Sequence, residues 1–114
     1  MAFGTRARFE AIKEAGFANI LAAYSAVGTA TTDHTRLITL HNTTDVEVYV
    51  SLDGSTNHLR MPSGEARVLD LTTNRVKDDG LFIAEGTTFW VKRVAGAPGS
   101  GSFWVEVMYA DGGV

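Results

Sequence analysis

Apolar and polar residues alternate with a period of two along several short segments of this chain. In VEVYVSL (residues 46–52) the residues at even-numbered positions are all apolar. In SFWVEVMYA (102–110) the same holds for the odd-numbered positions from Phe103 to Tyr109. Successive side chains of a strand point to opposite faces of a sheet. Each segment therefore predicts a β-strand with one strongly apolar face.

Other segments rich in β-branched and aromatic residues predict further strands. They are RLITLHN (36–42), ARVLDL (66–71), LFIAE (81–85) and TTFWVKRV (87–94). The mostly apolar NILAAYSAVG (19–28) is also compatible with a helix, but we interpret it as a strand that stops at Gly28. Only Thr43, Thr44 and Asp45 lie between RLITLHN and VEVYVSL, and with Asn42 they form the turn-forming tetrad NTTD, which predicts an antiparallel hairpin.

The beginning of the chain has a different pattern. TRARFEAIKEAG (5–16) contains good helix formers, with Thr5 as the expected N-cap and Gly16 at the expected C-terminus. Its apolar face is narrow and consists chiefly of Phe9, Ile12 and alanines, so this helix needs a surface to pack against. We predict a short N-terminal helix or arm over residues 1–16.

Many short strands with closely spaced turns leave no room for helices between the strands. We therefore predict an all-β fold, an antiparallel β-sandwich of seven to eight strands that is jelly-roll-like or immunoglobulin-like, with a closed barrel as the alternative. The expected organisation is the N-terminal helix or arm (1–16) followed by one β-sandwich domain (17–114).

Composition narrows the classes of function. The chain has 114 residues, 20% of them charged, and a formal net charge of −3, so it lacks the basic field that non-specific binding to nucleic acid needs. It has no cysteine, which excludes disulfides and thiolate metal sites. The first residues show no pattern of an export signal, and nowhere do about 20 apolar residues follow one another. We expect no nucleic-acid and no membrane partner.

The polar stretch SLDGSTNHL (51–59) is the first candidate for chemistry. Asp53-Gly54 directly follows a predicted strand, where this dipeptide favours a tight turn. The spacing of Asp53, Ser55 and Asn57 resembles the start of a calcium loop, but the glycine and closing glutamate of that loop do not follow. Turns are also predicted around Pro62, Gly64 and Gly86.

The three histidines, His34, His41 and His58, are accompanied by no G-x-S-x-G motif, so we predict loop or strand-edge positions for them. We predict no catalytic, cofactor-binding or metal-binding residue, and no enzyme. Tyr49, Trp90 and Trp104 are candidates for a stacking platform that binds sugars or bases, although such residues more often fill a core or an interface. With Phe9 and Ile12 they are our candidate interface residues.

A series of turn and strand motifs lies between His41 and Ala110: Asn42-Thr43-Thr44-Asp45, Ser51, Asp53-Gly54, His58, Pro62, Gly64, Leu69-Asp70 and Ala84-Glu85-Gly86-Thr87. With these motifs the middle and end of the chain resemble a group of small virion structural proteins encoded by tailed bacteriophages. The resemblance does not extend to residues 1–35. No catalytic residue belongs to that pattern, so the resemblance implies a structural protein of the phage particle.

We therefore expect a non-enzymatic component of a tailed-phage virion, at the head-to-tail, neck or collar region or in the tail, which acts through repeated subunit contacts. The expected partners are further copies of the chain and portal, capsid or tail proteins. The expected location is the virion, after synthesis in the host cytoplasm. A capsid decoration or cement protein is the alternative, and a carbohydrate-binding module with surface aromatics is the alternative from another class.

Overall fold

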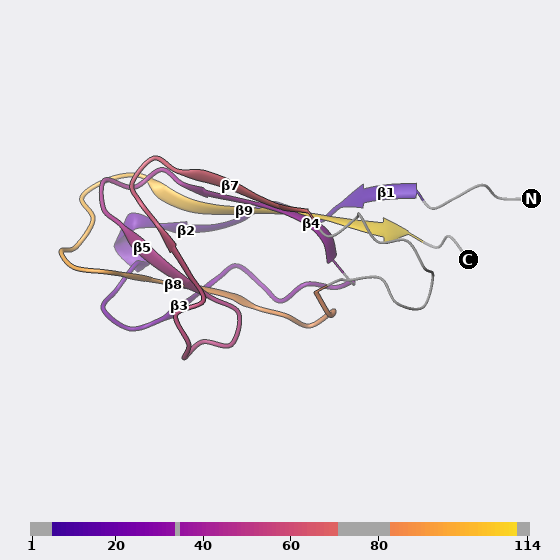
Figure 1. Cartoon of the computed structure of the whole chain (residues 1–114), viewed down its shortest axis with the longest axis horizontal. Coiled ribbons are helices and arrows are strands. Elements are labelled where there is room, and N and C mark those ends of the chain that lie inside the picture. The colour runs from indigo at the N-terminus through magenta and orange to yellow at the C-terminus, as the bar shows by residue number, and fades with distance from the viewer. Residues whose placement is uncertain (1–5, 34, 71–82, 112–114) are drawn as a thin grey trace, which may run out of the picture.

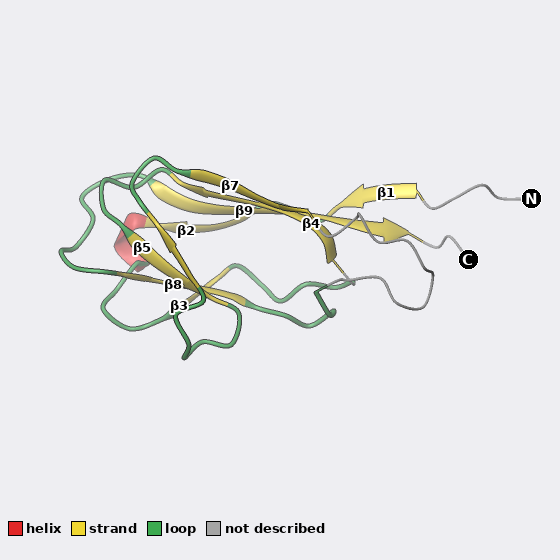
Figure 2. Cartoon of the chain, viewed as in Figure 1, coloured by secondary structure: helices red, strands yellow, loops and turns green. Residues whose placement is uncertain are grey.

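The computed structural model describes residues 6–33, 35–70 and 83–111, which form two antiparallel sheets packed face to face (Figure 1). The first sheet contains β1 (Arg6–Phe9), β2 (Lys13–Gly16), β4 (Thr35–Asn42), β7 (Ala66–Asp70) and β9 (Ser102–Asp111). The second contains β3 (Ser25–Val27), β5 (Val48–Ser51), β6 (Leu59–Met61) and β8 (Phe89–Arg93). A single 3₁₀ turn, η1 (Phe17–Asn19), follows β2 (Figure 2). The predicted all-β antiparallel sandwich is confirmed.

The order of the strands is that of a jelly roll. The first sheet has the order β1-β9-β4-β7, with β2 also paired to β9, and the second has the order β3-β8-β5-β6. β1 and β2 lie one after the other along the same edge of β9, so together they occupy one strand position that is interrupted at residues 10–12. Each sheet then has four strand positions, and the chain repeatedly crosses from one sheet to the other.

The core lies between the sheets and is built from alternate residues of each strand. In the first sheet Ile38 is paired with Val107 and Leu40 with Val105, and all four side chains are buried. In the second sheet Val48 and Val50 are fully buried, while Val46 and Leu52 pack against the core from its margin. The predicted apolar faces of residues 46–52 and 102–110 therefore point inward. Burial contributes about 1.5–3 kcal/mol for each large aliphatic or aromatic side chain.

The predicted hairpin between residues 36–42 and 46–52 is wrong, because β4 and β5 belong to different sheets. A two-residue hairpin turn needs positive φ angles, and among the described residues only glycines have them. NTTD instead forms a corner around Asn42, whose buried side-chain amide donates to the carbonyl oxygens of Val46 (3.0 Å), Met61 (3.2 Å) and Pro62 (3.1 Å). Its Oδ1 accepts from the backbone N–H and the hydroxyl of Thr44.

The predicted N-terminal helix is also wrong: β1 and β2 occupy these residues, and the expected N-cap Thr5 lies outside the described part of the chain. Lys13 and Ala15 are buried while Glu14 is exposed, which is the period of a strand. Helix propensity differs little among ordinary residues and is easily outweighed by tertiary pairing. Here the edge of β9 supplies backbone partners and a place for Ala15 in the core.

The remaining strand predictions agree only in part with the structure. The strand expected over 19–28 is reduced to β3, and β6 was not expected. Leu81 and Phe82 of the expected strand 81–85 lie outside the described residues, and Ile83 forms an isolated bridge with Thr35. The strands expected over 66–71 and 87–94 correspond to β7 and β8.

The corner at Asn42 gives a prediction for stability. Replacing Asn42 by Ala removes the buried amide that bonds to the carbonyl groups of Val46, Met61 and Pro62 and to Thr44, so we expect the free energy of unfolding to fall by about 2–4 kcal/mol. Denaturant unfolding monitored by tryptophan fluorescence measures this change. The control is Asn19→Ala, an exposed asparagine for which we expect less than about 0.5 kcal/mol. Equal effects of the two substitutions would contradict the role of Asn42.

Candidate functional site

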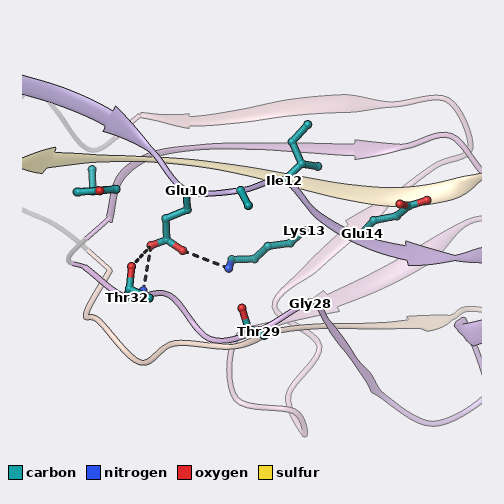
Figure 3. Close-up of a pocket in the computed structure, with 9 residues that line it drawn as sticks. Glu10, Ile12, Lys13, Glu14, Gly28, Thr29 and Thr32 are labelled. Atoms are coloured by element: carbon teal, nitrogen blue, oxygen red, sulfur yellow. Dashed lines mark hydrogen bonds and ion pairs between the residues drawn. The ribbon is translucent and has the colours of Figure 1, made fainter.

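An open pocket of about 580 Å³ lies where the chain passes from β1 to β2 (Figure 3). One wall is residues 10–14, which comprise the interruption between these strands and the start of β2, and the other is the segment after β3 with Gly28, Thr29 and Thr32. Tyr109 of β9 completes the lining. Glu10 and Lys13 point into the space between these segments, whereas Ile12 points away from them.

A buried ion pair lies within one wall, and its carboxylate is hydrogen-bonded to the other wall. Lys13 Nζ lies 3.2 Å from Glu10 Oε1, and the two side chains are only 5% and 8% exposed. Glu10 Oε2 accepts hydrogen bonds from the backbone N–H (3.0 Å) and the hydroxyl (3.3 Å) of Thr32. The aliphatic part of Lys13 lies against Gly28, where an added Cβ would come within 2.8 Å of Lys13 Cβ. Gly28 (φ +69°) thus permits the close approach of the two segments.

The bonding pattern of this pocket indicates a structural role. Both carboxylate oxygens of Glu10 are already engaged, and its charge is neutralised by Lys13. A buried ion pair of this kind is costly to break because either partner alone would be an uncompensated charge. The hydrogen bonds of Glu10 to Thr32 and the contact of Lys13 with Gly28 therefore fasten the start of the first sheet to the segment that leads into β4, and the ion pair balances the charge of Glu10 there.

The stretch SLDGSTNHL forms a polar turn after β5, to which the hydroxyl of Tyr24 also donates. Asp53 Oδ1 accepts from the backbone N–H groups of Ser55 (2.9 Å) and Thr56 (2.8 Å) and from the hydroxyl of Ser51 (2.8 Å). These hydrogen bonds hold the pKa of Asp53 well below its usual range, the bond from the Ser55 N–H being the largest cause. Gly54 has a φ of +82°, and an added Cβ there would meet the ring of Trp90 at 3.1 Å. The turn therefore needs glycine at this position.

His58 belongs to the same turn. Its side-chain Nδ1 accepts a hydrogen bond from the backbone N–H of Leu52 (3.0 Å), and the backbone N–H of His58 donates to the carbonyl of Val50 (3.1 Å). His41 lies on the outer face of the first sheet, beside Trp104 in the register of β4 and β9, and His34 lies outside the described residues. The structure thus gives His58 a structural hydrogen bond in the turn between β5 and β6, whereas His41 lies in β4 of the other sheet.

The other predicted turn residues also lie in connections. Gly64 (φ +82°) donates its N–H to the carbonyl of Asn42 (2.8 Å), and Gly86 (φ +85°) donates to that of Thr31 (2.7 Å). The carbonyl of Pro62 accepts the backbone N–H of Glu65 (3.2 Å).

The three candidate aromatics do not form one platform. Tyr49 and Trp90 lie on the outer face of the second sheet, where Tyr24 and Tyr49 both contact the ammonium group of Lys92, at 4.8 and 5.7 Å from the ring centroids. Part of Trp90 is covered by the turn at Gly54. Trp104 lies on the outer face of the first sheet, on the opposite side of the sandwich. A continuous stacking surface of these residues is therefore not formed.

Trp104 lines a shallow hollow of about 300 Å³. The other lining residues, Thr39, His41, Thr43 and Glu106, come from β4, β9 and the corner after β4. Trp104 Nε1 donates to the hydroxyl of Thr43 (3.3 Å), which fixes the ring beside the hollow. The hollow thus combines one aromatic ring with hydroxyl, imidazole and carboxylate groups.

The outer face of the first sheet also exposes large apolar side chains. Phe9 is 69% exposed, Ile12 57% and Val68 59%. Phe9 is paired with Met108 and Val68 with Thr39, and these partners both lie on the outer face. The apolar side chains therefore lie toward the two edges of this face, on either side of the hollow with Trp104.

Within the described ranges, no group of three or more histidine, cysteine, aspartate or glutamate residues could hold a metal ion. Of the helices in that part of the chain, none has the length and apolar character to cross a membrane. Comparison of the chain with protein-family models, with curated proteins and with solved structures gives no match.

Sequence reasoning missed the Glu10–Lys13 pair and the exposed Val68. The spacing of Glu10 and Lys13 also suits a helix. The contact of Glu10 with Thr32 joins residues 22 positions apart, which no local pattern indicates. Val68 alternates normally within ARVLDL, so only the order of the strands reveals that it lies on an edge strand facing outward.

The Glu10–Lys13 pair gives a prediction for stability. We expect Lys13→Met alone to lower the free energy of unfolding by about 2–4 kcal/mol, because the Glu10 carboxylate loses its counter-charge. The double variant Lys13→Met with Glu10→Gln should be less destabilised than the single variant by at least about 1 kcal/mol. The control is Arg60→Met, which breaks the exposed Arg60–Glu47 pair and should cost less than about 1 kcal/mol. A double variant with a lower free energy of unfolding than Lys13→Met alone would contradict this role of the ion pair.

Proposed function

We propose that this chain is a non-enzymatic structural component of a tailed-phage virion, located at the head-to-tail, neck or collar region or in the tail, and that it acts through repeated contacts between subunits. The observation that carries the proposal is the outer face of the first sheet, where Phe9, Ile12 and Val68 are each more than half exposed. These apolar side chains lie toward the two edges of that face, where a neighbouring subunit would bury them.

The fold is compatible with this proposal. Jelly rolls occur in viral capsid proteins and in lectins, although a fold alone does not determine function. The polar clusters of the described residues are engaged internally: Asp53 is bonded to its own turn, and Glu10 to Lys13 and Thr32. The outer face of the first sheet is therefore the better candidate for contact with other molecules. Its interface is modest in one copy and gains strength when it is repeated around a ring or a lattice.

A capsid decoration or cement protein would use the same surface but in many more copies. The number of copies in each particle therefore separates the two locations. A ring at the head-to-tail region is expected to contain on the order of a dozen copies, whereas a decoration protein covers a lattice of hundreds.

The test is quantitative mass spectrometry of purified phage particles. We expect the chain in about a dozen copies in each particle, and we expect Ile12→Ser to reduce that number at least about threefold because it removes an exposed apolar contact. The matched control is Leu21→Ser, which changes a 51%-exposed side chain outside the sheets and should leave the copy number unchanged. Absence of the wild-type chain from particles would contradict the proposal.

The hollow beside Trp104 favours a second candidate function, carbohydrate binding. An aromatic ring next to hydroxyl, imidazole and carboxylate groups can stack on a sugar ring and bind its hydroxyl groups. In a glycan-array screen, binding that is lost in Trp104→Ala and kept in Tyr49→Ala, on the opposite face, would support this function and weigh against a purely structural role. Absence of glycan binding by the wild-type chain would exclude carbohydrate binding for the glycans on the array.

A further inference from the structure

The two edges of the first sheet are β1 and β7, and no other strand among the described residues pairs with their outer sides. β1 pairs antiparallel with β9, β9 with β4, and β4 with β7. Three antiparallel steps make β1 and β7 run in opposite directions. If a second copy is placed beside the first in the same orientation, its β1 therefore meets β7 of the first copy in the antiparallel sense.

Backbone hydrogen bonds show which residues of β7 face the outer side. The N–H of Asn42 donates to the carbonyl of Glu65 (2.9 Å), so the backbone of Glu65 faces β4. In an antiparallel ladder, successive residues of a strand direct their N–H and C=O groups alternately to one side and the other. Arg67 and Leu69 thus bond toward β4, and the N–H and C=O of Val68 point to the open edge.

The same reasoning applies to β1. The N–H of Glu10 donates to the carbonyl of Val107 (3.0 Å), so the backbone of Glu10 faces β9. The preceding residue, Phe9, therefore directs its N–H and C=O away from β9, to the open edge.

The side chains of Phe9 and Val68 lie on the same face of the sheet. Phe9 is paired with Met108 of β9, and Val68 lies in one row with Thr39 and Glu106. Met108 and Glu106 are two residues apart on β9, so both point outward. Residues that are directly opposite in a ladder share a face. Phe9 of one copy can therefore lie directly opposite Val68 of the next. In that position the N–H and C=O groups of Phe9 and of Val68 are directed at each other.

We propose that copies of this chain associate head to tail by pairing β7 of one copy with β1 of the next, which extends the first sheet from subunit to subunit. This inference rests on the proposed assembly function and names the contact that produces it. Natural proteins commonly protect open edges with proline, charged side chains or a bulge. The strands RARF and ARVLD carry arginine but contain no proline, and each presents an exposed apolar side chain, Phe9 or Val68, at the edge. Such a heterologous contact closes into a ring when the rotation between subunits permits it.

Disulfide cross-linking tests the pairing directly, because the chain contains no cysteine of its own. We would prepare the full-length single variants Phe9→Cys, Ala66→Cys, Val68→Cys and Asp70→Cys, mix Phe9→Cys with each of the others, and oxidise. Directly opposite residues have Cα atoms about 5.5 Å apart, within the range of a disulfide. We expect mixed dimers between Phe9→Cys and one variant of β7, and few dimers between identical variants.

A second experiment separates backbone pairing from side-chain contact. In Val68→Pro the N–H directed at the open edge is lost while the bonds to β4 remain, as proline is tolerated at such edge positions. We expect the oligomers seen by native mass spectrometry to dissociate at about tenfold higher concentration than wild type. The control Val68→Thr keeps the N–H and the branched shape, and its oligomers should persist. Thermal unfolding of both variants shows whether the monomer is intact.

The outcomes distinguish this inference from the proposed function. Mixed cross-links together with weakened assembly of Val68→Pro support pairing of β7 with β1. The wild-type chain could form oligomers while the cysteine variants cross-link only with identical variants, or at none of the three positions of β7. That result would overturn this pairing and leave an assembly role standing. A wild-type chain that stays monomeric and is absent from particles would overturn both.

Discussion

Pairing along both edges of β9 is the constraint on which the rest of this structure depends. β9 is the longest strand, with ten residues, and it is paired with β4 on one side and with β1 and β2 on the other. Its alternate residues Phe103, Val105 and Val107 are fully buried against the second sheet. Backbone pairing and burial thus act on the same strand. The first sheet owes its strand order to this one segment.

Local patterns in the sequence predicted those features of the fold that depend on one segment alone. The two-residue period of 46–52 and 102–110 predicted strands and their buried faces, because burial of one face requires that period. The pairing of strands was less accessible. A turn residue such as Asn42 suits both a hairpin within one sheet and a crossing from one sheet to the other. In the structure its bonds to Val46, Met61 and Pro62 hold the crossing between the sheets. The prediction of a helix near the start was wrong for a related reason. Residues 6–16 form strands because they pair with β9, which is distant in sequence.

The candidate site shows the same division between local and distant information. Asp53 and Gly54 could be interpreted from their neighbours because all the bonds of Asp53 are made within four residues. The role of His58 also depends on a near neighbour, Leu52, but no sequence rule predicts that an imidazole will accept that backbone N–H. Glu10, Lys13 and Thr32 meet only through the tertiary fold. The separation of Trp104 from Trp90 likewise follows from the assignment of their strands to different sheets.

The position of β1 and β9 in the chain has a consequence for the order in which the first sheet forms during translation. Residues 6–16 are synthesised before their partner, residues 102–111, which follow the other described strands in the chain. Contacts between segments so distant in sequence form slowly because a long loop must close first. Unfinished chains therefore cannot yet present β1 as a properly held sheet edge. This delay would protect nascent polypeptides on the same messenger RNA from premature association.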